Sequence, residues 1–141
     1  MTEPDHIQNE KAEHAVLKPK VLIADDDKFL LDMYAMKFCE KGFQVVPASG
    51  GEEALEALRV GGDTFRALLL DLVMPGMDGF TLLKTLREEK LSPSCKVIVL
   101  SNLGEPTDVE KARKYAIDGY IIKASATPSE VVEKVQKIIG K

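Results

Sequence analysis

Two hydrophobic patterns alternate five times along the chain, and this alternation limits the possible folds more than any other feature of the sequence. Short apolar runs are typical of strands buried on both faces of a sheet, whereas apolar residues three and four positions apart are typical of amphipathic helices. The predicted strands are 21–24, 43–48, 65–73, 95–101 and 119–123. The predicted helices are 28–42, 51–60, 80–90, 108–116 and 127–140.

Strands that alternate with helices indicate a parallel sheet, because each helix returns the chain to the end of the sheet where the next strand begins. Right-handed crossovers then place helices on both faces. We therefore expect an α/β fold with a doubly wound, five-stranded parallel sheet and five helices. The pattern contains no internal repeat, so we expect one domain over residues 19–141, preceded by a flexible extension over residues 1–18.

Particular residues predict the ends and the buried faces of two helices. Thr127, Pro128 and Glu130 match a capping box with proline in the first turn, which predicts the start of the last helix. The residues predicted to face the core in that helix are Val131, Val135, Ile138 and Ile139. In the first helix they are Phe29, Met33, Met36 and Phe38.

Charge and composition argue against several classes of function. A net charge of −4 and an isoelectric point near 5.3 disfavour nonspecific binding to nucleic acid or to anionic membranes. No apolar run approaches the roughly 20 residues of a membrane helix, and the first residues lack a signal-peptide pattern. We therefore expect a cytoplasmic protein that binds neither nucleic acid directly nor a membrane. We also expect no output domain beyond residue 141, and therefore neither direct DNA binding nor a fused enzyme.

The cysteines and histidines do not form a recognisable metal site. Cys39 and Cys95 are far apart and lie in apolar surroundings, so we expect both to be buried. His6 and His14 lie in the polar extension, where solvated side chains are the simpler expectation.

Polar residues follow the predicted strands at the end where ligands bind in open parallel α/β sheets. The first strand is followed by Asp25, Asp26 and Asp27, the third by Asp71, the fourth by Ser101 and the fifth by Lys123. Each residue alone is explained by a helix cap, a turn or a solvated surface. Their joint occurrence at four strand ends predicts one shared site, from which Asp27 is separated as the expected N-cap of the first helix.

Clustered carboxylates repel one another unless a cation lies among them. Carboxylate oxygens suit Mg²⁺, which also accepts phosphate oxygens, while a lysine and a hydroxyl could bind further phosphoryl oxygens. The residues therefore predict a site for a phosphoryl group beside a metal ion, with an aspartate available as nucleophile.

Four motifs carry a resemblance to a known family. The segments "VLIADDD", "LLLDLVMPGMDG", "VIVLS" and "DGYIIK" occur in this order, and the second is the most specific. From about residue 19 to residue 140, the chain resembles the receiver domain of two-component response regulators, in particular stand-alone, chemotaxis-regulator-like receivers. The resemblance implies a flavodoxin-like fold with strand order 2-1-3-4-5.

The resemblance also implies a role for each site residue. It implies phosphorylation of Asp71, with Mg²⁺, or Mn²⁺ as the alternative, as the only cofactor. The implied metal ligands are Asp25, Asp26, Asp71 and the backbone carbonyl of Val73, with Asp26 the more direct ligand of the acidic pair. Lys123 would bind phosphate, and Ser101 and Tyr120 would act as the switch residues.

Two departures from the family pattern concern individual loops. Ala124 follows the lysine where the family commonly has proline. A cis bond without proline costs about 3 kcal/mol, so we expect a trans bond between Lys123 and Ala124, or else a strained site. The apolar Val73 and Leu103 occupy positions that influence attack by water in this family. Neither can hydrogen-bond a water molecule, so we expect slow self-dephosphorylation.

The expected function is that of a phosphoaccepting regulator rather than an enzyme. The resemblance implies a sensor histidine kinase or phosphotransfer protein as donor, and an unidentified protein as downstream target. The chain would be a monomer or a phosphorylation-dependent dimer. The alternative from another class is an interaction module that needs no phosphorylation.

Two further alternatives share this fold class. A phosphate-ester hydrolase with an aspartyl intermediate would require a D-x-D-x-T pattern after the first strand, which the sequence lacks. A flavin-binding protein would require a phosphate loop rich in glycine, serine or threonine, whereas three aspartates stand there.

Overall fold

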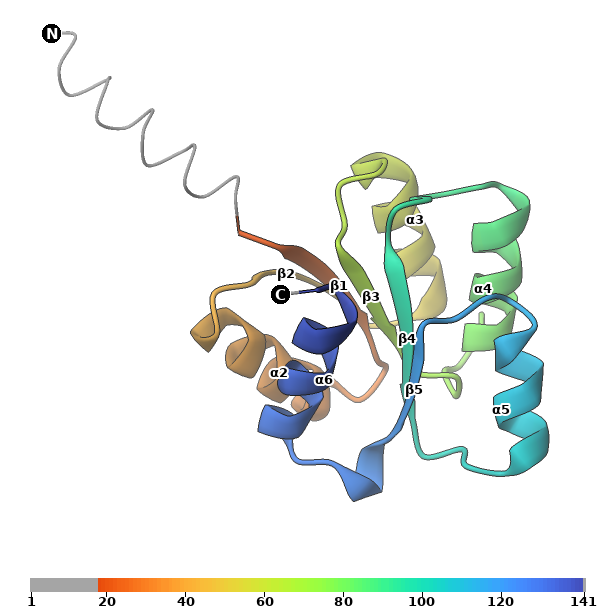
Figure 1. Cartoon of the computed structure of the whole chain (residues 1–141). Helices are drawn as coiled ribbons and strands as arrows, with labels where there is room; N and C mark the ends of the chain where they lie inside the picture. The colour runs from red at the N-terminus through yellow and green to blue at the C-terminus, as the bar shows by residue number, and fades with distance from the viewer. Residues whose placement is uncertain (1–17, 141) are drawn as a thin grey trace, which may run out of the picture.

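Five parallel strands in the order β2-β1-β3-β4-β5 form the centre of the computed structural model, which describes residues 18–140 (Figure 1). The strands are β1 Lys20–Ala24, β2 Gln44–Ala48, β3 Ala67–Leu70, β4 Lys96–Ser101 and β5 Gly119–Ile122. The helices are α2 Lys28–Glu40, α3 Gly51–Gly61, α4 Gly79–Glu88, α5 Pro106–Arg113, the 3₁₀ turn η1 Lys123–Ser125 and α6 Pro128–Ile138. The predicted α/β fold and strand order are therefore confirmed. The expected extension over residues 1–18 lies, apart from its last residue, outside the described part.

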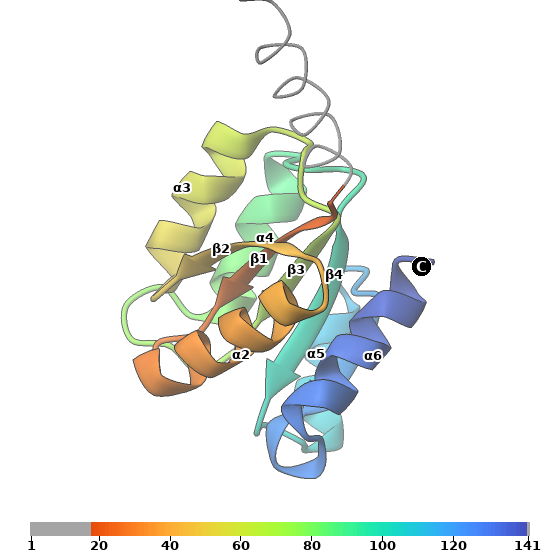
Figure 2. The same ribbon diagram turned by 90° about the vertical axis from the view of Figure 1, so that its left-hand side faces the viewer.

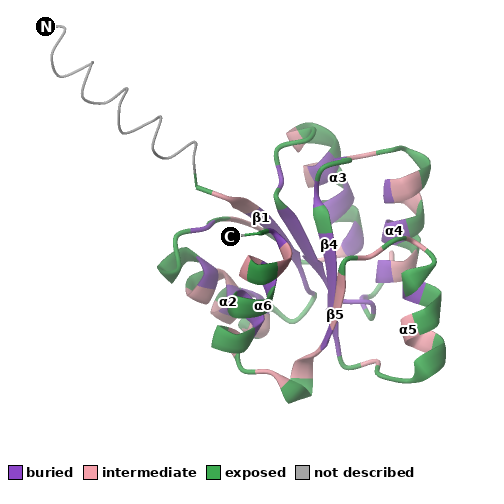
Figure 3. Ribbon diagram, viewed as in Figure 1, coloured by how far each residue is buried: buried purple, intermediate pink, exposed green. Residues whose placement is uncertain are grey.

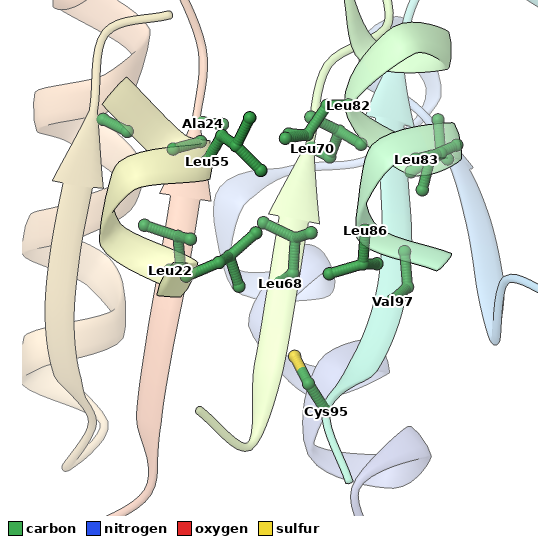
Figure 4. Packing of buried hydrophobic residues seen from close by; sticks show 14 of the residues in the cluster. Leu22, Ala24, Leu55, Leu68, Leu70, Leu82, Leu83, Leu86, Cys95 and Val97 are labelled. Carbon is green, nitrogen blue, oxygen red and sulfur yellow. The ribbon is translucent and has the colours of Figure 1, made fainter. Parts of the chain in front are cut away.

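Helices cover both faces of the sheet, α2 and α6 on one face and α3, α4 and α5 on the other (Figures 1 and 2). The side chains of each central strand alternate between these two layers, as the two-residue period of a strand requires. In β3, Leu68 and Leu70 face the α3–α4 layer, where they pack with Leu22 and Leu86 (Figure 4). Because both faces are covered, the central strands are buried along their length (Figure 3), which explains their continuous apolar sequences.

The predicted core face of α2 is partly wrong. Leu31, Tyr34 and Phe38 face the sheet, and the Phe38 ring packs edge-to-face against Phe43 with ring centroids 5.0 Å apart. Phe29 is 80% exposed and Met36 is 62% exposed. The helix carries apolar residues on two opposite sides, so periodicity alone could not indicate which side meets the sheet.

The predictions for the two cysteines and the last helix also have mixed outcomes. Cys95 is buried as expected, whereas Cys39 is exposed near the end of α2, one position beyond the stripe that faces the sheet. The capping box at the start of α6 is confirmed, because the Thr127 hydroxyl accepts from the Glu130 amide and the Glu130 carboxylate accepts from the Thr127 amide. Val131, Val135 and Ile139 are buried, Ile138 is half-buried, and Val132 joins the buried stripe.

Among residues 18–140, no helix combines the length and the apolar character needed to cross a lipid bilayer.

Two phenylalanines on α2 give a matched test of which side supports the fold. We expect Phe38→Ala to lower the free energy of unfolding by about 3–5 kcal/mol, because Phe38 is fully buried and its loss leaves a cavity. Phe29→Ala should change it by less than about 0.5 kcal/mol, because this ring is exposed. Urea unfolding of both variants measures the difference, and equal losses would contradict this packing of α2.

Candidate functional site

The register of the parallel strands brings the polar residues together. Ala24 of β1 pairs with Leu70 of β3, so Asp25 and Asp71 leave the sheet side by side. The backbone amide of Asp71 donates to the Ala24 carbonyl at 3.0 Å, which extends the ladder by one step. The two carboxylates are therefore held close together by the backbone of the central strands rather than by a mobile loop.

Lys123 links these two carboxylates. Its Nζ lies 2.7 Å from Asp25 Oδ2 and 2.7 Å from Asp71 Oδ2. The Lys123 side chain is 10% exposed, and both aspartates are buried. A buried charge requires partners that offset its lost hydration. The lysine supplies one positive charge to two buried negative charges.

The pKa values of Asp25 and Lys123 are both raised, although burial and the charged partners act in opposite directions on each group. Burial raises the pKa of Asp25 above its usual range, although the hydrogen bonds from Lys123 and the Asp27 amide counteract part of the effect. Burial alone lowers the pKa of Lys123, but the hydrogen bonds and negative charges of Asp25 and Asp71 outweigh it and leave the pKa raised. Lys123 is therefore held in its charged form.

The carboxylates of Asp25, Asp26 and Asp71 are arranged as a set of oxygen ligands. One oxygen from each residue lies within 4.8 Å of the others, and Asp26 is exposed at the rim. Three ionised carboxylates and one ammonium leave two negative charges, which a divalent cation would neutralise. Hard oxygen donors with one side open to water fit Mg²⁺, which retains several water ligands.

Asp27 and Val73, which lie next to the acidic cluster, make different contacts. Asp27 caps α2 as predicted, since its Oδ1 accepts from the amides of Phe29 and Leu30 at 3.1 and 3.2 Å. Val73 lies two positions after Asp71, and its amide donates to Asp71 Oδ1 at 3.2 Å. Val73 is 58% exposed. The predicted use of the Val73 carbonyl as a metal ligand remains a prediction.

The two switch candidates are connected through Leu103. Ser101 is fully buried, and its Oγ accepts from the Leu103 amide at 3.3 Å. Tyr120 is half-buried, and its hydroxyl donates to the Leu103 carbonyl. Burial raises the pKa of the Tyr120 hydroxyl. Ser101 and Tyr120 therefore hold opposite polar groups of one residue, so a change at either can reach the other.

Two residues at this site were not identified from the sequence. At Gly79, an added Cβ would lie 2.5 Å from the Asp71 carbonyl oxygen, so only glycine permits α4 to approach the loop that follows β3 so closely. The position of Gly79 directly after Asp78, which is the N-cap of α4, was the sequence feature that could have indicated this role. Asn102 accepts from the Ala124 amide at 2.9 Å through its Oδ1, and no sequence pattern indicates this contact.

The predicted trans bond between Lys123 and Ala124 is confirmed, since no cis bond occurs in residues 18–140.

The sheet order 2-1-3-4-5, with three aspartates and a lysine gathered at its strand ends, is the arrangement expected of a receiver-type regulatory domain. The family model described as the response regulator receiver domain matches residues 21–136, and the chain belongs to this family. It is a receiver domain of the two-component response regulators.

Individual relatives agree with this assignment. The chain is 33% identical over 109 residues to the transcriptional activator protein PfeR of Pseudomonas aeruginosa, a match covering 77% of this chain and 34% of PfeR. The chain thus spans about a third of the length of this curated relative. The receiver domain of the Francisella response regulator 1452 is 32% identical, with a TM-score of 0.76 and coverage of 86% of this chain and 97% of that one. A chain of the CheX–CheY–BeF₃–Mg²⁺ complex from Borrelia burgdorferi is 28% identical, with a TM-score of 0.78 and coverage of 87% and 90%.

Removing the charge of Lys123 tests its role between the two carboxylates. We expect Lys123→Met to lower the free energy of unfolding in metal-free buffer by about 1–3 kcal/mol, because two buried carboxylates lose the cation that bridges them. The matched control is Lys37→Met, which removes an exposed ion pair with Glu40 and should cost less than about 1 kcal/mol. Urea unfolding of both variants, with a chelator present, measures the difference. Equal stability of the Lys123→Met and wild-type proteins would contradict the electrostatic account.

Proposed function

We propose that this domain accepts a phosphoryl group on Asp71 and changes a partner-binding surface in response. The observation that carries the proposal is the ion-pair arrangement at the strand ends, in which Lys123 bridges the buried carboxylates of Asp25 and Asp71 at 2.7 Å. A buried aspartate held beside a cation, with a further acid at the rim, suits a nucleophile for an anionic phosphoryl donor. The domain is proposed to act as a regulator rather than as an enzyme with its own substrate turnover.

The proposed reaction is an in-line transfer from a phosphohistidine. A carboxylate oxygen of Asp71 forms a bond to phosphorus while the bond between phosphorus and the imidazole nitrogen breaks. The electron pair of that bond remains on the imidazole. The proposed donor is therefore a sensor histidine kinase or a phosphotransfer protein, and a small acyl phosphate is a chemically equivalent donor.

Three groups of the chain would then hold the new acyl phosphate. In the structure, the Lys123 ammonium is paired with the carboxylates of Asp25 and Asp71. After phosphorylation it would turn toward a phosphoryl oxygen. Ser101 Oγ accepts from the Leu103 amide, and its own proton is available to donate to another oxygen. Asp25, Asp26, Asp71 and the Val73 carbonyl would hold Mg²⁺ or Mn²⁺, which when bound supplies positive charge for the phosphoryl oxygens. The Borrelia relative is a complex that contains both BeF₃ and Mg²⁺, which supports this ligand chemistry.

The proposed output surface includes α5 and β5. Movement of Ser101 toward the phosphoryl group would disturb its hydrogen bond with the Leu103 amide. The Leu103 carbonyl in turn accepts a hydrogen bond from the Tyr120 hydroxyl. Helix α5 has a single buried residue, Ala112, and is otherwise held by limited contacts such as Lys111 over the Phe80 ring at 4.2 Å from its centroid. A weakly held helix can shift at low energetic cost. The downstream target and any phosphorylation-dependent dimer are proposed to use this surface.

Mass spectrometry after incubation with acetyl phosphate and Mg²⁺ tests the proposed phosphorylation. We expect the wild-type protein to gain the mass of one phosphoryl group, and Asp71→Asn to gain none because its amide is not nucleophilic. The matched control is Asp27→Asn, which keeps an N-cap of similar strength and should be phosphorylated normally. A chelator should greatly reduce the reaction.

The opposite results identify the rival function. A wild-type protein that gains no mass, while remaining folded, would support an interaction module that acts without phosphorylation. A mass gain that persists in Asp71→Asn would place the phosphoryl group on another residue.

The lifetime of the phosphorylated form tests the roles proposed for Val73 and Leu103. Neither side chain can hydrogen-bond an attacking water molecule, so we expect Val73→Asn or Leu103→Glu to speed the loss of the phosphoryl group about 2- to 10-fold, the effect of one added hydrogen bond. The control is Val60→Asn, the same substitution at an exposed valine on α3. Decay is followed by mass spectrometry after the donor is removed. Unchanged decay in both site variants would contradict this account.

A further inference from the structure

Asn102 links the end of β4, where Ser101 lies, to the turn η1, which begins at Lys123. It directly follows Ser101, and its Oδ1 accepts from the backbone amide of Ala124, which directly follows Lys123, at 2.9 Å. The last paired residues of β4 and β5 are Ser101 and Ile122. The Asn102 side chain therefore makes a connection just beyond the point where the pairing of these two strands ends.

This bond depends on the residue at position 124. Lys123 begins the 3₁₀ turn η1, and the first amides of such a turn have no partner within it. The N-cap residue Ile122 offers no side-chain acceptor. Alanine retains the amide proton that a proline at this position would lack. Asn102 thus satisfies a donor that exists because Ala124 is not proline.

The other bonds of the loop show why this connection matters for the site. Ser101 Oγ and the Tyr120 hydroxyl fix the two polar groups of Leu103. Both of these bonds lie within β4, β5 and the loop between β4 and α5. The bond from Asn102 reaches forward to the loop after β5, from which the Lys123 side chain extends to Asp25 and Asp71. It therefore sets the backbone of Lys123 relative to that of Ser101.

We propose that Asn102 is a positioning residue, which holds the turn that begins at Lys123 against the end of β4 so that the Lys123 ammonium and the Ser101 hydroxyl can bind the same phosphoryl group. This inference rests on the proposed phosphorylation of Asp71. The two phosphate-binding groups come from different strands, and both must lie within hydrogen-bonding distance of one acyl phosphate. A connection between their backbones reduces the conformational freedom that phosphorylation has to remove.

The first experiment measures phosphorylation by acetyl phosphate in Mg²⁺ for the wild type, Asn102→Ala and Ser125→Ala. Ser125 is an exposed residue of the same 3₁₀ turn and serves as the control. We expect Asn102→Ala to slow the reaction about 2- to 10-fold, which corresponds to the loss of one hydrogen bond, and Ser125→Ala to leave it unchanged. Urea unfolding confirms that all three proteins are folded under the assay conditions.

A second comparison separates positioning of Lys123 from a general effect on the loop. The same rates are measured for Lys123→Met and for the double variant Asn102→Ala/Lys123→Met, with longer incubation. If Asn102 acts through Lys123, its loss has no further effect once the ammonium is absent. An equal fold loss in both backgrounds overturns the inference.

Amide hydrogen exchange at Ala124 supplies a direct signature of the bond. We expect Asn102→Ala to speed exchange of this amide, and Asn102→Asp, which keeps an acceptor oxygen in the same place, to restore protection. Unchanged exchange in Asn102→Ala overturns the inference.

The outcomes distinguish this inference from the proposed function. If the wild type takes up no phosphoryl group, the proposed function fails and the inference fails with it. If the wild type is phosphorylated and Asn102→Ala reacts at the same rate, only the role of Asn102 is wrong.

Discussion

Lys123 and the two buried carboxylates that it bridges impose the constraint on which the rest of the site depends. Asp25 and Asp71 leave neighbouring strands side by side, so their negative charges are brought together out of water. Such a pair is unstable unless positive charge lies between its members. One lysine at 2.7 Å from each offsets part of the charge. The addition of Asp26 leaves the site with two excess negative charges, which is the electrostatic basis for binding a divalent cation.

The sheet makes this arrangement possible because it is rigid where the charges lie. Helices on both faces bury β1, β3 and β4, and the ladder continues through the amide of Asp71 to the carbonyl of Ala24. Gly79 allows α4 to lie directly against the Asp71 backbone. The loop after β4, helix α5 and the turn η1, which lie near Ser101 and Lys123, are less buried than these central strands.

Several parts of this fold could be predicted from the sequence because they depend on local pattern. The alternation of apolar runs and amphipathic segments indicated the five strands and their parallel order of connection, and the capping residues at Asp27 and Thr127 were found by their spacing. The side of α2 that meets the sheet was predicted wrongly at Phe29 and Met36, because apolar residues lie on both sides of that helix and its contacts with β1, β2 and α6 decide between them. Cys39 was predicted to be buried because its sequence neighbours are apolar, but it is exposed.

By itself, the sequence determined the fold class and the strand ends at which Asp25, Asp71, Ser101 and Lys123 lie, and it favoured a trans peptide after Lys123. These follow from residue periodicity, from the rule that parallel strands end at one edge, and from the absence of proline at Ala124. Only the tertiary structure decided that one ammonium contacts two carboxylates, that the Tyr120 hydroxyl reaches the Leu103 carbonyl, and that Asn102 joins two loops. Each of these contacts joins residues more than 15 positions apart, and strand register with loop conformation, rather than local pattern, sets their distances.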